Sequence, residues 1–525
     1  MFNAELWTQL DIDMIKSLNG KLFPCFLITL FLFYSLFWYL NNPRTLVALV
    51  VFVSLAIVVV LGFCYLRDRD ALGNEWIFLA VLVLFSLIFC FMFPPFSVPD
   101  EGHHYFSTYW LVDSLPFNSR VAADGSFLVR ETDLNLYSKL SSSLISSSSF
   151  DSIFNHFSWF ESSKYVSFSD LAFSIGTENV PAKIGSVIGL QIGLLLGLGA
   201  YPVFYLGRIG SIAVFCFCAF HAYKIAPKGK SVIVFVSLLP MTLHLAASYS
   251  YDSGIIALSL LVFAFLMRGF FGEDHSIGIR QIITYFIVSA LLAPCKVIYC
   301  GLIVLAVFIP LDKFEDVNKG RLSKYLLIFV IAASVLVLRL ASVSGLVSQS
   351  TSSSRGGEAG QFYSLNDILL HPRNSFMVFC RTLDSLGDFY WETTLGYSLG
   401  WFQENLRMPT FYMIPYLVCG FICCIDSQDE DAFLNQPLPA MFIGAFAVAA
   451  LGSIASMWLG WTFNNESVIQ GVQGRYFLPV LPALLFGLRS RAIKYRGISA
   501  TLVLLGICSM NCIYLIRFIS VATCM

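Results

Sequence analysis

The chain has 525 residues, of which 57% are hydrophobic and 16% aromatic, with fifty Phe. Soluble globular proteins are about 45–50% apolar even when Gly is counted, so the composition excludes a water-soluble globular fold. The formal net charge is −1, which excludes the strongly basic surface typical of a nucleic-acid-binding protein. A polytopic membrane protein is expected.

The apolar segments predict an all-α polytopic fold with about thirteen membrane-spanning helices, because a helix needs about 20 apolar residues to cross the hydrocarbon core. The polar N-terminus and the long first apolar run do not resemble a cleavable signal peptide. The Gly-rich segment 184–200 either adds a span or forms an interfacial or re-entrant helix. The predicted spans lie near 22–40, 44–66, 76–96, 201–226, 231–249, 252–271, 281–295, 297–310, 322–341, 409–425, 438–459, 475–489 and 499–520.

Basic connectors between the spans predict the orientation, since short loops rich in Lys and Arg remain in the cytoplasm. Three such connectors lie at 224–230, 313–324 and 489–496. They face one side if segment 184–226 crosses the membrane once, which favours the interfacial or re-entrant form of 184–200. The N-terminus is then cytoplasmic and the C-terminus lies outside.

This orientation places two long polar stretches on the outer face, and both are expected to carry amphipathic helices. We find no internal repeat, which disfavours a secondary transporter built from two related halves. The predicted parts of the chain are N-terminal spans (1–96), a first outer loop (97–183), central spans (184–341), a second outer loop (342–408) and C-terminal spans (409–525).

The segment 94–105 places titratable groups where a hydrophobic span ends at two prolines, which stop the helix. A carboxylate at the membrane surface can act as a general base towards a sugar hydroxyl or hold a divalent cation. The alternative is a solvated helix start, where Asp and Glu cap free N–H groups. The candidate groups are Asp100, Glu101, His103 and His104.

A second motif, from Gln470 to Pro482, contains Gly471, Gly474 and Arg475 at the predicted outer mouth of a span. The glycines are expected to let a ligand approach the backbone closely. The Arg475 fork suits a phosphate group, which it can hold bidentately. The alternative is an arginine that extends to the lipid headgroups.

Three further charges lie within or beside predicted spans. Asp252 follows a tight outward turn, where it either orients His or Arg groups or caps the next helix. Lys296 lies between two short spans near the outer surface, and Arg208 lies in a Gly-flanked part of a span. Charges at the bilayer centre cost about 2.5–3.5 kcal/mol on insertion scales, so they usually mark a cavity or a site.

Aromatic residues stand beside the acids Asp388 and Glu392 in the segment from Asp388 to Phe402. Aromatic rings can stack on a sugar while carboxylates such as Asp388 and Glu392 bind its hydroxyls. Aromatic belts at membrane interfaces have the same pattern. No nucleotide-binding loop, dinucleotide fingerprint or nucleophile elbow is evident. An activated substrate is therefore expected to arrive already energised, as a lipid-linked donor would.

Four motifs occur in order over most of residues 76–489. They are Pro99-Asp100-Glu101-x-x-His104, Pro240-Met241 with Ala247-Ser248-x-Ser250-x-Asp252, Lys296-x-x-Tyr299, and Gly471-x-Gln473-Gly474-Arg475-Tyr476-Phe477-x-Pro479. Together they resemble a bacterial group of polytopic proteins catalogued as domain of unknown function 2142. That group looks related to the GT-C glycosyltransferases, which use polyprenyl-phosphate sugars. In many GT-C enzymes the acidic loop follows the first span, whereas here it follows the third.

The resemblance implies an inverting sugar transfer at the periplasmic face of a bacterial inner membrane. The donor would be a sugar on undecaprenyl phosphate, and the acceptor a cell-surface glycan such as an O-antigen or lipopolysaccharide. Asp100 is the first choice for the base, with Glu101 assisting it or sharing a divalent cation such as Mg²⁺ or Mn²⁺. Metal dependence varies among GT-C enzymes, so the resemblance leaves it open.

The remaining candidates fall into two groups by expected role. The groups expected to orient the base or bind the acceptor are His103, His104, Asp252, Asp388 and Glu392. The groups expected to bind the donor phosphate are Arg475, Lys296, Tyr476, Gln473 and Arg208.

Two other functions fit the same outer loops. A glycan polymerase, which joins lipid-linked repeat units, would use similar acidic and basic groups. A transporter or flippase would need essential charges throughout the membrane interior, whereas the charges here gather at one mouth. In each case the partners are lipid-linked glycans and the bilayer, and no nucleic acid is expected.

Overall fold

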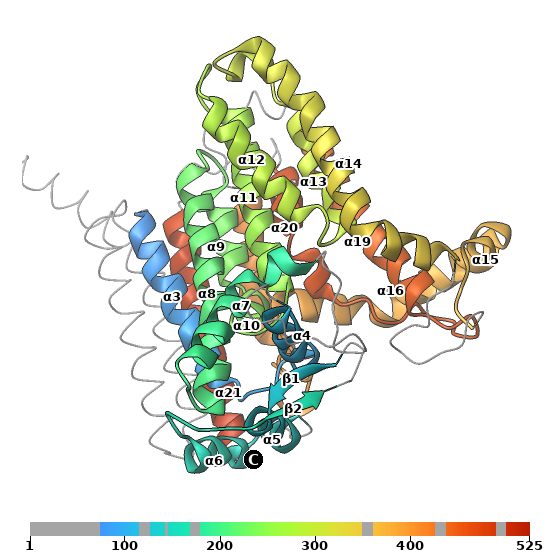
Figure 1. Ribbon diagram of the computed structural model, residues 1–525. Helices are drawn as coiled ribbons and strands as arrows, with labels where there is room; N and C mark the ends of the chain where they lie inside the picture. The colour runs from blue at the N-terminus through green and yellow to red at the C-terminus, as the bar shows by residue number, and fades with distance from the viewer. Residues whose placement is uncertain are drawn as a thin grey trace, which may run out of the picture.

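The computed structural model describes residues 74–114, 126–141, 145–168, 179–348, 361–425, 437–489 and 500–524 (Figure 1). The predicted spans 22–40 and 44–66 lie outside the described residues, as does most of the basic connector 489–496. The described chain is mostly helical.

Six helices are long and apolar enough to cross a membrane, and each coincides with a predicted span. Helices suit this environment because all their backbone hydrogen bonds are made within one segment. The six are α3 (Glu75–Met92), α8 (Ala200–Ile225), α11 (Asp252–Phe271), α14 (Val317–Ser348), α19 (Leu438–Gly460) and α21 (Ala500–Cys524). They confirm a polytopic helical membrane protein.

The other predicted spans in the described residues form shorter or broken helices, so the count of thirteen stays a prediction. Pro240 begins a new helix directly after a break at Leu239, as expected for a residue that cannot continue a helix. These elements are α9 (Lys230–Leu238), α10 (Pro240–Ala246), α12 (Ile279–Leu292), η4 (Val297–Tyr299), α13 (Cys300–Val304), η5 (Leu305–Phe308), η6 (Leu311–Lys313), η8 (Thr410–Tyr412), α17 (Met413–Ile425), η9 (Gly474–Phe477) and α20 (Leu481–Gly487).

The Gly-rich segment forms α7 (Val180–Leu195), which packs against the first half of α8. A Cβ on Gly185 would lie 2.4 Å from the carbonyl oxygen of Gly210, and one on Gly189 would lie 2.2 Å from that of Leu206. Small residues at such positions let two helices meet backbone to backbone. With 16 residues, α7 is short for a membrane span. This length favours the interfacial or re-entrant interpretation.

The first polar stretch folds into a compact unit at one end of the bundle, at the bottom of Figure 1. It contains two antiparallel strands in which Phe127 pairs with Phe168. The fold is therefore not purely α-helical as predicted, because short runs of aromatic and β-branched residues pair here. The elements are α4 (Glu101–Asp113), β1 (Phe127–Arg130), α5 (Glu131–Leu140), α6 (Ser147–His156) and β2 (Tyr165–Phe168).

The second polar stretch contains α15 (Leu365–Leu370), α16 (Pro372–Leu395) and η7 (Glu404–Leu406). It packs on the first stretch although the two are far apart in sequence. The indole N–H of Trp401 donates to the carbonyl oxygen of Phe96 at 2.9 Å, and the backbone N–H of Ile145 donates to Oε1 of Gln403 at 3.0 Å. The two stretches thus meet beside the loop that precedes α4.

Candidate functional site

The loop between α3 and α4 holds Asp100 in a left-handed backbone conformation, with a φ of 63°. Such angles are uncommon for residues other than Gly and often occur at functional sites. Asp100 occupies the N-cap position of α4, yet its side chain makes no capping hydrogen bond. The carboxylate therefore does not satisfy the helix terminus, contrary to the capping alternative.

Asp100 instead pairs with Arg475 in η9. Nη2 of Arg475 lies 2.8 Å from Oδ2 of Asp100. The two side chains differ in exposure, because 50% of Asp100 is accessible against 5% of Arg475. The pair joins a buried cation to a carboxylate that is accessible from outside the protein.

Asp252, the first residue of α11, extends this pair into a row of four charges. Nε of Arg475 lies 3.5 Å from Oδ2 of Asp252, and Nζ of Lys296 lies 3.1 Å from Oδ1 of the same carboxylate. Burial alone would lower the pKa of Lys296, but the Asp252 carboxylate raises that pKa above its ordinary value. The ammonium group therefore stays charged. We call Asp100, Arg475, Asp252 and Lys296 the charged row.

Aromatic rings cover one side of the charged row. The ammonium of Lys296 lies 4.0 Å from the ring centroid of Tyr476 and 5.2 Å from that of Tyr251. Both distances are within the range of cation–π attraction. The hydroxyl of Tyr299 donates to the carbonyl oxygen of Tyr476 at 2.9 Å. These contacts fix Lys296 and the turn that carries Arg475 relative to each other.

The turn with Arg475 is held by α16. The backbone N–H of Gly474 donates to Oγ1 of Thr393 at 2.7 Å, and Oγ1 of Thr394 donates to the Gly474 carbonyl at 3.0 Å. A Cβ on Gly474 would lie 1.9 Å from the carbonyl oxygen of Tyr390. The prediction that this glycine makes room for a ligand is wrong, because the space is filled by the backbone of α16.

Arg475 has hydrogen-bond donors that the described part of the protein does not use. Its Nε and Nη1 are buried and form no hydrogen bond among the described residues. The buried Oε1 of Gln473, two residues earlier, also lacks a described partner. Buried N–H groups of a guanidinium are costly to leave unpaired and suit an anion such as phosphate. The arginine does not extend to the headgroups as the alternative supposed, since it is 5% exposed.

Glu101 and Arg208 form a separate pair that is completely buried. Nε and Nη2 of Arg208 donate to the two carboxylate oxygens of Glu101 at 2.9 and 2.6 Å. Arg208 also donates to the carbonyl oxygens of Cys90, Phe93 and Pro94, at the end of α3. Both side chains are 0% exposed. This arrangement favours a structural role for both residues, rather than base assistance and phosphate binding.

The two histidines lie in the first turn of α4. His104 is buried, with its ring centroid 4.9 Å from that of Tyr251. Burial and the nearby Lys183 ammonium hold the pKa of His104 well below its ordinary value, so its imidazole is neutral. His103 is half-buried, with its ring centroid 5.5 Å from that of His104. His104 therefore lies behind the charged row, against the ring that flanks Lys296.

The two acidic candidates of α16 lie apart from the charged row. Glu392 forms its ion pair with Arg407, and Asp388 is exposed on the helix surface. The structure brings α16 to the site through Tyr390, Thr393 and Thr394, which contact the turn of Gly474. Acceptor binding by Asp388 and Glu392 stays a prediction.

The residues predicted to share a metal ion do not converge. The carboxylates of Asp100 and Glu101 point to different arginines, and both oxygens of Glu101 are already paired. Among the residues that the structure describes, no group of three or more His, Cys, Asp or Glu side chains has the geometry of a metal site. The donor set therefore does not fit the Mg²⁺ or Mn²⁺ site considered from the sequence.

Lys183 belongs to the surroundings of the site and was not selected from the sequence. It is 1% exposed, and its Nζ donates to the His104 carbonyl at 2.7 Å and to Oγ of Ser107 at 2.5 Å. These bonds tie α7 to the first turns of α4, directly behind Asp100. The available signal was a lone charged residue at the start of an otherwise apolar helix.

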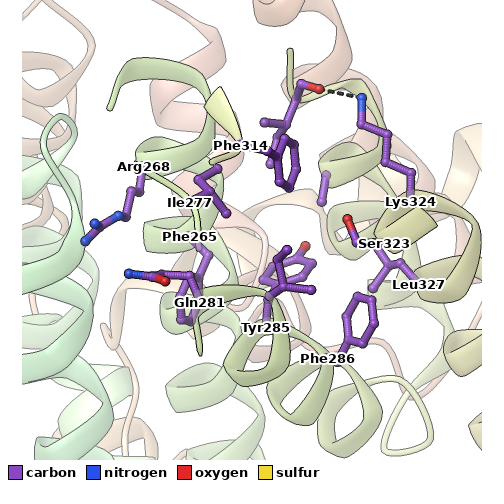
Figure 2. A pocket seen from close by; sticks show the side chains of 13 residues that line it. Phe265, Arg268, Ile277, Gln281, Tyr285, Phe286, Phe314, Ser323, Lys324 and Leu327 are labelled. Carbon is purple, nitrogen blue, oxygen red and sulfur yellow. Dashed lines mark hydrogen bonds between the residues drawn. The ribbon is translucent and has the colours of Figure 1, made fainter. Parts of the chain in front are cut away.

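A small cavity lies at the opposite end of α11, between α11, α12 and α14 (Figure 2). Its volume is about 50 Å³, and its lining includes Phe265, Arg268, Tyr285 and Lys324. Lys324 donates to the Ile309 carbonyl, and Arg268 donates to the Ser276 carbonyl at 3.4 Å. None of the described residues that line it is acidic. The cavity lacks the paired carboxylates and cations of the charged row.

The family model described as "Predicted membrane protein (DUF2142)" matches residues 79–484. The chain belongs to this family. No curated protein and no solved structure matches the chain significantly. The DUF2142 match covers every residue of the charged row and the whole of the two packed helices α7 and α8. It supports the sequence resemblance and a multi-pass membrane location.

Proposed function

We propose that this DUF2142 protein is a membrane glycosyltransferase that moves a sugar from a polyprenyl-phosphate donor to a cell-surface glycan at the outer face of a bacterial inner membrane. The observation that carries the proposal is the Asp100–Arg475 pair. A half-exposed carboxylate lies 2.8 Å from a buried guanidinium whose Nη1 forms no hydrogen bond among the described residues. This arrangement sets a candidate base beside a candidate phosphate site.

Arg475 and Lys296 are the groups proposed to bind the donor phosphate. Arg475 is buried and Lys296 is half-buried, both keep their charge, and they are linked through Asp252. A guanidinium offers a planar fork to phosphate oxygens, and the ammonium adds a second positive charge. When the bond between the sugar and the phosphate breaks, negative charge grows on the leaving phosphate. Cations already in place stabilise that charge without reorganisation.

Asp100 is the group proposed to act as the base. The acceptor hydroxyl oxygen attacks the anomeric carbon of the sugar, Asp100 takes the hydroxyl proton, and the polyprenyl phosphate leaves with the bonding electron pair. Attack opposite to the leaving phosphate inverts the anomeric configuration. Asp100 is favoured over Glu101 and Asp252, because their carboxylates are 0% and 6% exposed against 50% for Asp100. Positioning of two membrane-delivered substrates supplies much of the rate.

Donor binding is coupled to activation of the base in this scheme. Asp100 and a phosphate compete for the same guanidinium, since Arg475 is the partner of Asp100 when no donor is bound. A bound phosphate shares the charge of Arg475 and loosens its hold on Asp100. The released carboxylate can then accept a hydrogen bond from the acceptor hydroxyl. The protein would therefore gain its base only when the donor is in place.

The test uses purified full-length protein with a defined polyprenyl-phosphate monosaccharide, together with mass spectrometry of surface glycans from cells with and without the gene. We expect consumption of the donor and a sugar residue that is missing from the glycans of the deletion strain. The Asp100→Asn variant should neither consume the donor nor restore the missing sugar when it is expressed in the deletion strain. Asp151→Asn, on the exposed surface of α6, should do both. Normal transfer by Asp100→Asn would overturn the assignment.

The same experiment separates the alternative functions. A glycan polymerase should ignore a lipid-linked monosaccharide and should instead change the length distribution of the surface glycan. A flippase should move the lipid-linked sugar across the membrane without forming a new covalent bond. The polymerase is the nearer alternative, because it would also use a base and a phosphate site at the outer mouth.

A further inference from the structure

An apolar groove lies between the η4–α13 segment and α14, at the side of the bundle where α14 slants past α13 and α19 (Figure 1). Its volume is about 410 Å³. No polar side chain other than a cysteine thiol lines it among the described residues. The lining includes Val297, Cys300, Val304, Ile328, Val335 and Leu336.

The groove begins next to the charged row. Val297, which lines the groove, directly follows Lys296, whose ammonium pairs with Asp252. On α14 the lining extends from Ile328 to Leu336. At a rise of 1.5 Å per residue this is a length of about 12 Å along the helix. The charged row and the apolar groove are therefore adjacent in the chain: Lys296 belongs to the row and Val297 lines the groove.

The groove is open on its lipid side. Val297 and Val304 are each 37% exposed, Ile328 is 50% exposed and Leu336 is 59% exposed. α14 is also the least buried of the six long helices, with 22% of its apolar window buried among the described residues. A chain that enters from the bilayer can thus occupy the groove without crossing a polar surface.

We propose that this groove binds the isoprenoid chain next to the phosphate of the lipid-linked donor, while Lys296 and Arg475 hold the phosphate. The proposal rests on the function proposed above and names the place of the donor tail. The ligand must carry an anion joined directly to a hydrocarbon chain, which matches a cation pair continued by an apolar groove. Packing of the chain against the groove lining adds van der Waals contacts and orients the phosphate.

The first test fills the groove from α14. Val335→Trp places a large ring in it, and Val337→Trp is the matched control, because Val337 lies on the opposite face of α14 and is 77% exposed. Transfer is measured with a long polyprenyl-phosphate sugar and with a short donor whose phosphate carries a methyl group in place of the isoprenoid chain. We expect Val335→Trp to raise KM for the long donor by about tenfold, equivalent to about 1.4 kcal/mol, because the ring displaces the isoprenoid chain from its packing contacts in the groove. The short donor and Val337→Trp should be little affected.

The second test measures occupancy directly and does not depend on turnover. A photoreactive polyprenyl phosphate without a sugar should label peptides of α13 and α14, and Ala332→Phe or Val335→Trp should reduce that labelling. A photoreactive phospholipid serves as the competing occupant. Equal labelling by both lipids would mean that the groove holds bulk lipid and would overturn the proposal.

The outcomes separate this proposal from the proposed function. If wild-type protein transfers sugar and Val335→Trp affects neither donor, or both donors equally, the groove assignment is wrong and the glycosyltransferase assignment stands. If wild-type protein transfers sugar from neither donor, the proposed function fails and the tail site fails with it. Thermal unfolding of each variant shows whether a loss of activity reflects a loss of fold.

Discussion

Two adjacent carboxylates, Asp100 and Glu101, form ion pairs with arginines that differ in almost every physical respect. Glu101 and Arg208 are both 0% exposed. They bond to each other, Arg208 also donates to carbonyls at the end of α3, and Glu101 accepts from the backbone N–H of Tyr249. Asp100 is 50% exposed, and Nη1 of Arg475 is buried without a hydrogen bond among the described residues. A carboxylate–arginine ion pair is thus buried at Glu101 and accessible at Asp100, the residue before it.

The cause of the difference is the backbone at the start of α4. Asp100 is in the left-handed region, with a φ of 63°, whereas Glu101 is the first residue of the helix. On either side of this change of conformation the two carboxylates reach different arginines, Arg475 and Arg208. A buried ion pair is retained only where its hydrogen bonds are complete, and that condition holds for Glu101 alone. The open pair is the one that can exchange its partner for a substrate.

The largest expected effect is on catalysis at the open pair. Asp100→Asn should lower kcat by about 10²–10⁴-fold, the usual contribution of a general base. The amide keeps the shape of the side chain, so the temperature of unfolding should change little. The measurement is sugar transfer from a defined donor, with Asp151→Asn as the control. A variant that loses stability as well as activity would place Asp100 with Glu101 as a structural residue.

Substitutions in the buried Glu101–Arg208 pair should lower the free energy of unfolding rather than act on catalysis directly. Glu101→Gln leaves the Arg208 charge buried without its partner and should cost about 3–5 kcal/mol in the free energy of unfolding. Replacing both residues, as Glu101→Gln with Arg208→Met, should recover part of that loss. The measurement is thermal or denaturant unfolding in detergent. Normal stability of Glu101→Gln with lost activity would contradict the structural role.

Arg475→Lys separates charge from geometry at the open pair. The ammonium keeps the positive charge but cannot offer a planar fork, so kcat/KM for the donor should fall by about 10–100-fold, equivalent to one charge-assisted hydrogen bond. The control is Arg381→Lys on the exposed surface of α16. An equal loss in both variants, or no loss in Arg475→Lys, would remove the phosphate role.

The smallest expected effect is a gain in binding of the lipid phosphate rather than a loss. Because Asp100 competes with phosphate for Arg475, Asp100→Asn should tighten binding of polyprenyl phosphate by up to about fivefold, the modest worth of a half-exposed ion pair. Glu101→Gln should show no such gain. The measurement is binding of the lipid phosphate, without a sugar, to protein in nanodiscs. Weaker binding by Asp100→Asn would show that the carboxylate supports the phosphate site rather than competing for it.

Individual residues show how far the sequence could lead to this site. Asp100, Arg475, Asp252 and Lys296 were all selected because charges are rare in an apolar chain, and the structure brings them into one row. Asp100 and Arg475 are 375 positions apart in the chain, so their pairing depends on the tertiary fold. The opposite fates of Asp100 and Glu101 could not be predicted, because one backbone angle separates them.

The role of Gly474 and the strands β1 and β2 show where sequence reasoning failed. A glycine beside a candidate ligand site fits either a ligand or a neighbouring backbone, and only the approach of α16 identifies the second. The strands have four residues each, which is too short to give a periodic signal in an aromatic-rich loop. Both features depend on segments that meet from distant parts of the chain.

The sequence by itself determined that the protein resides in a membrane, located the six long apolar helices, and provided a set of rare charges that includes the four of the charged row. These properties follow from hydrophobicity and residue type, which act locally along the chain. The tertiary structure alone decided which charges pair, which are exposed, and where an apolar groove meets Lys296. Those properties arise from packing between distant segments, since burial and low-dielectric pairing exist only once the helices assemble.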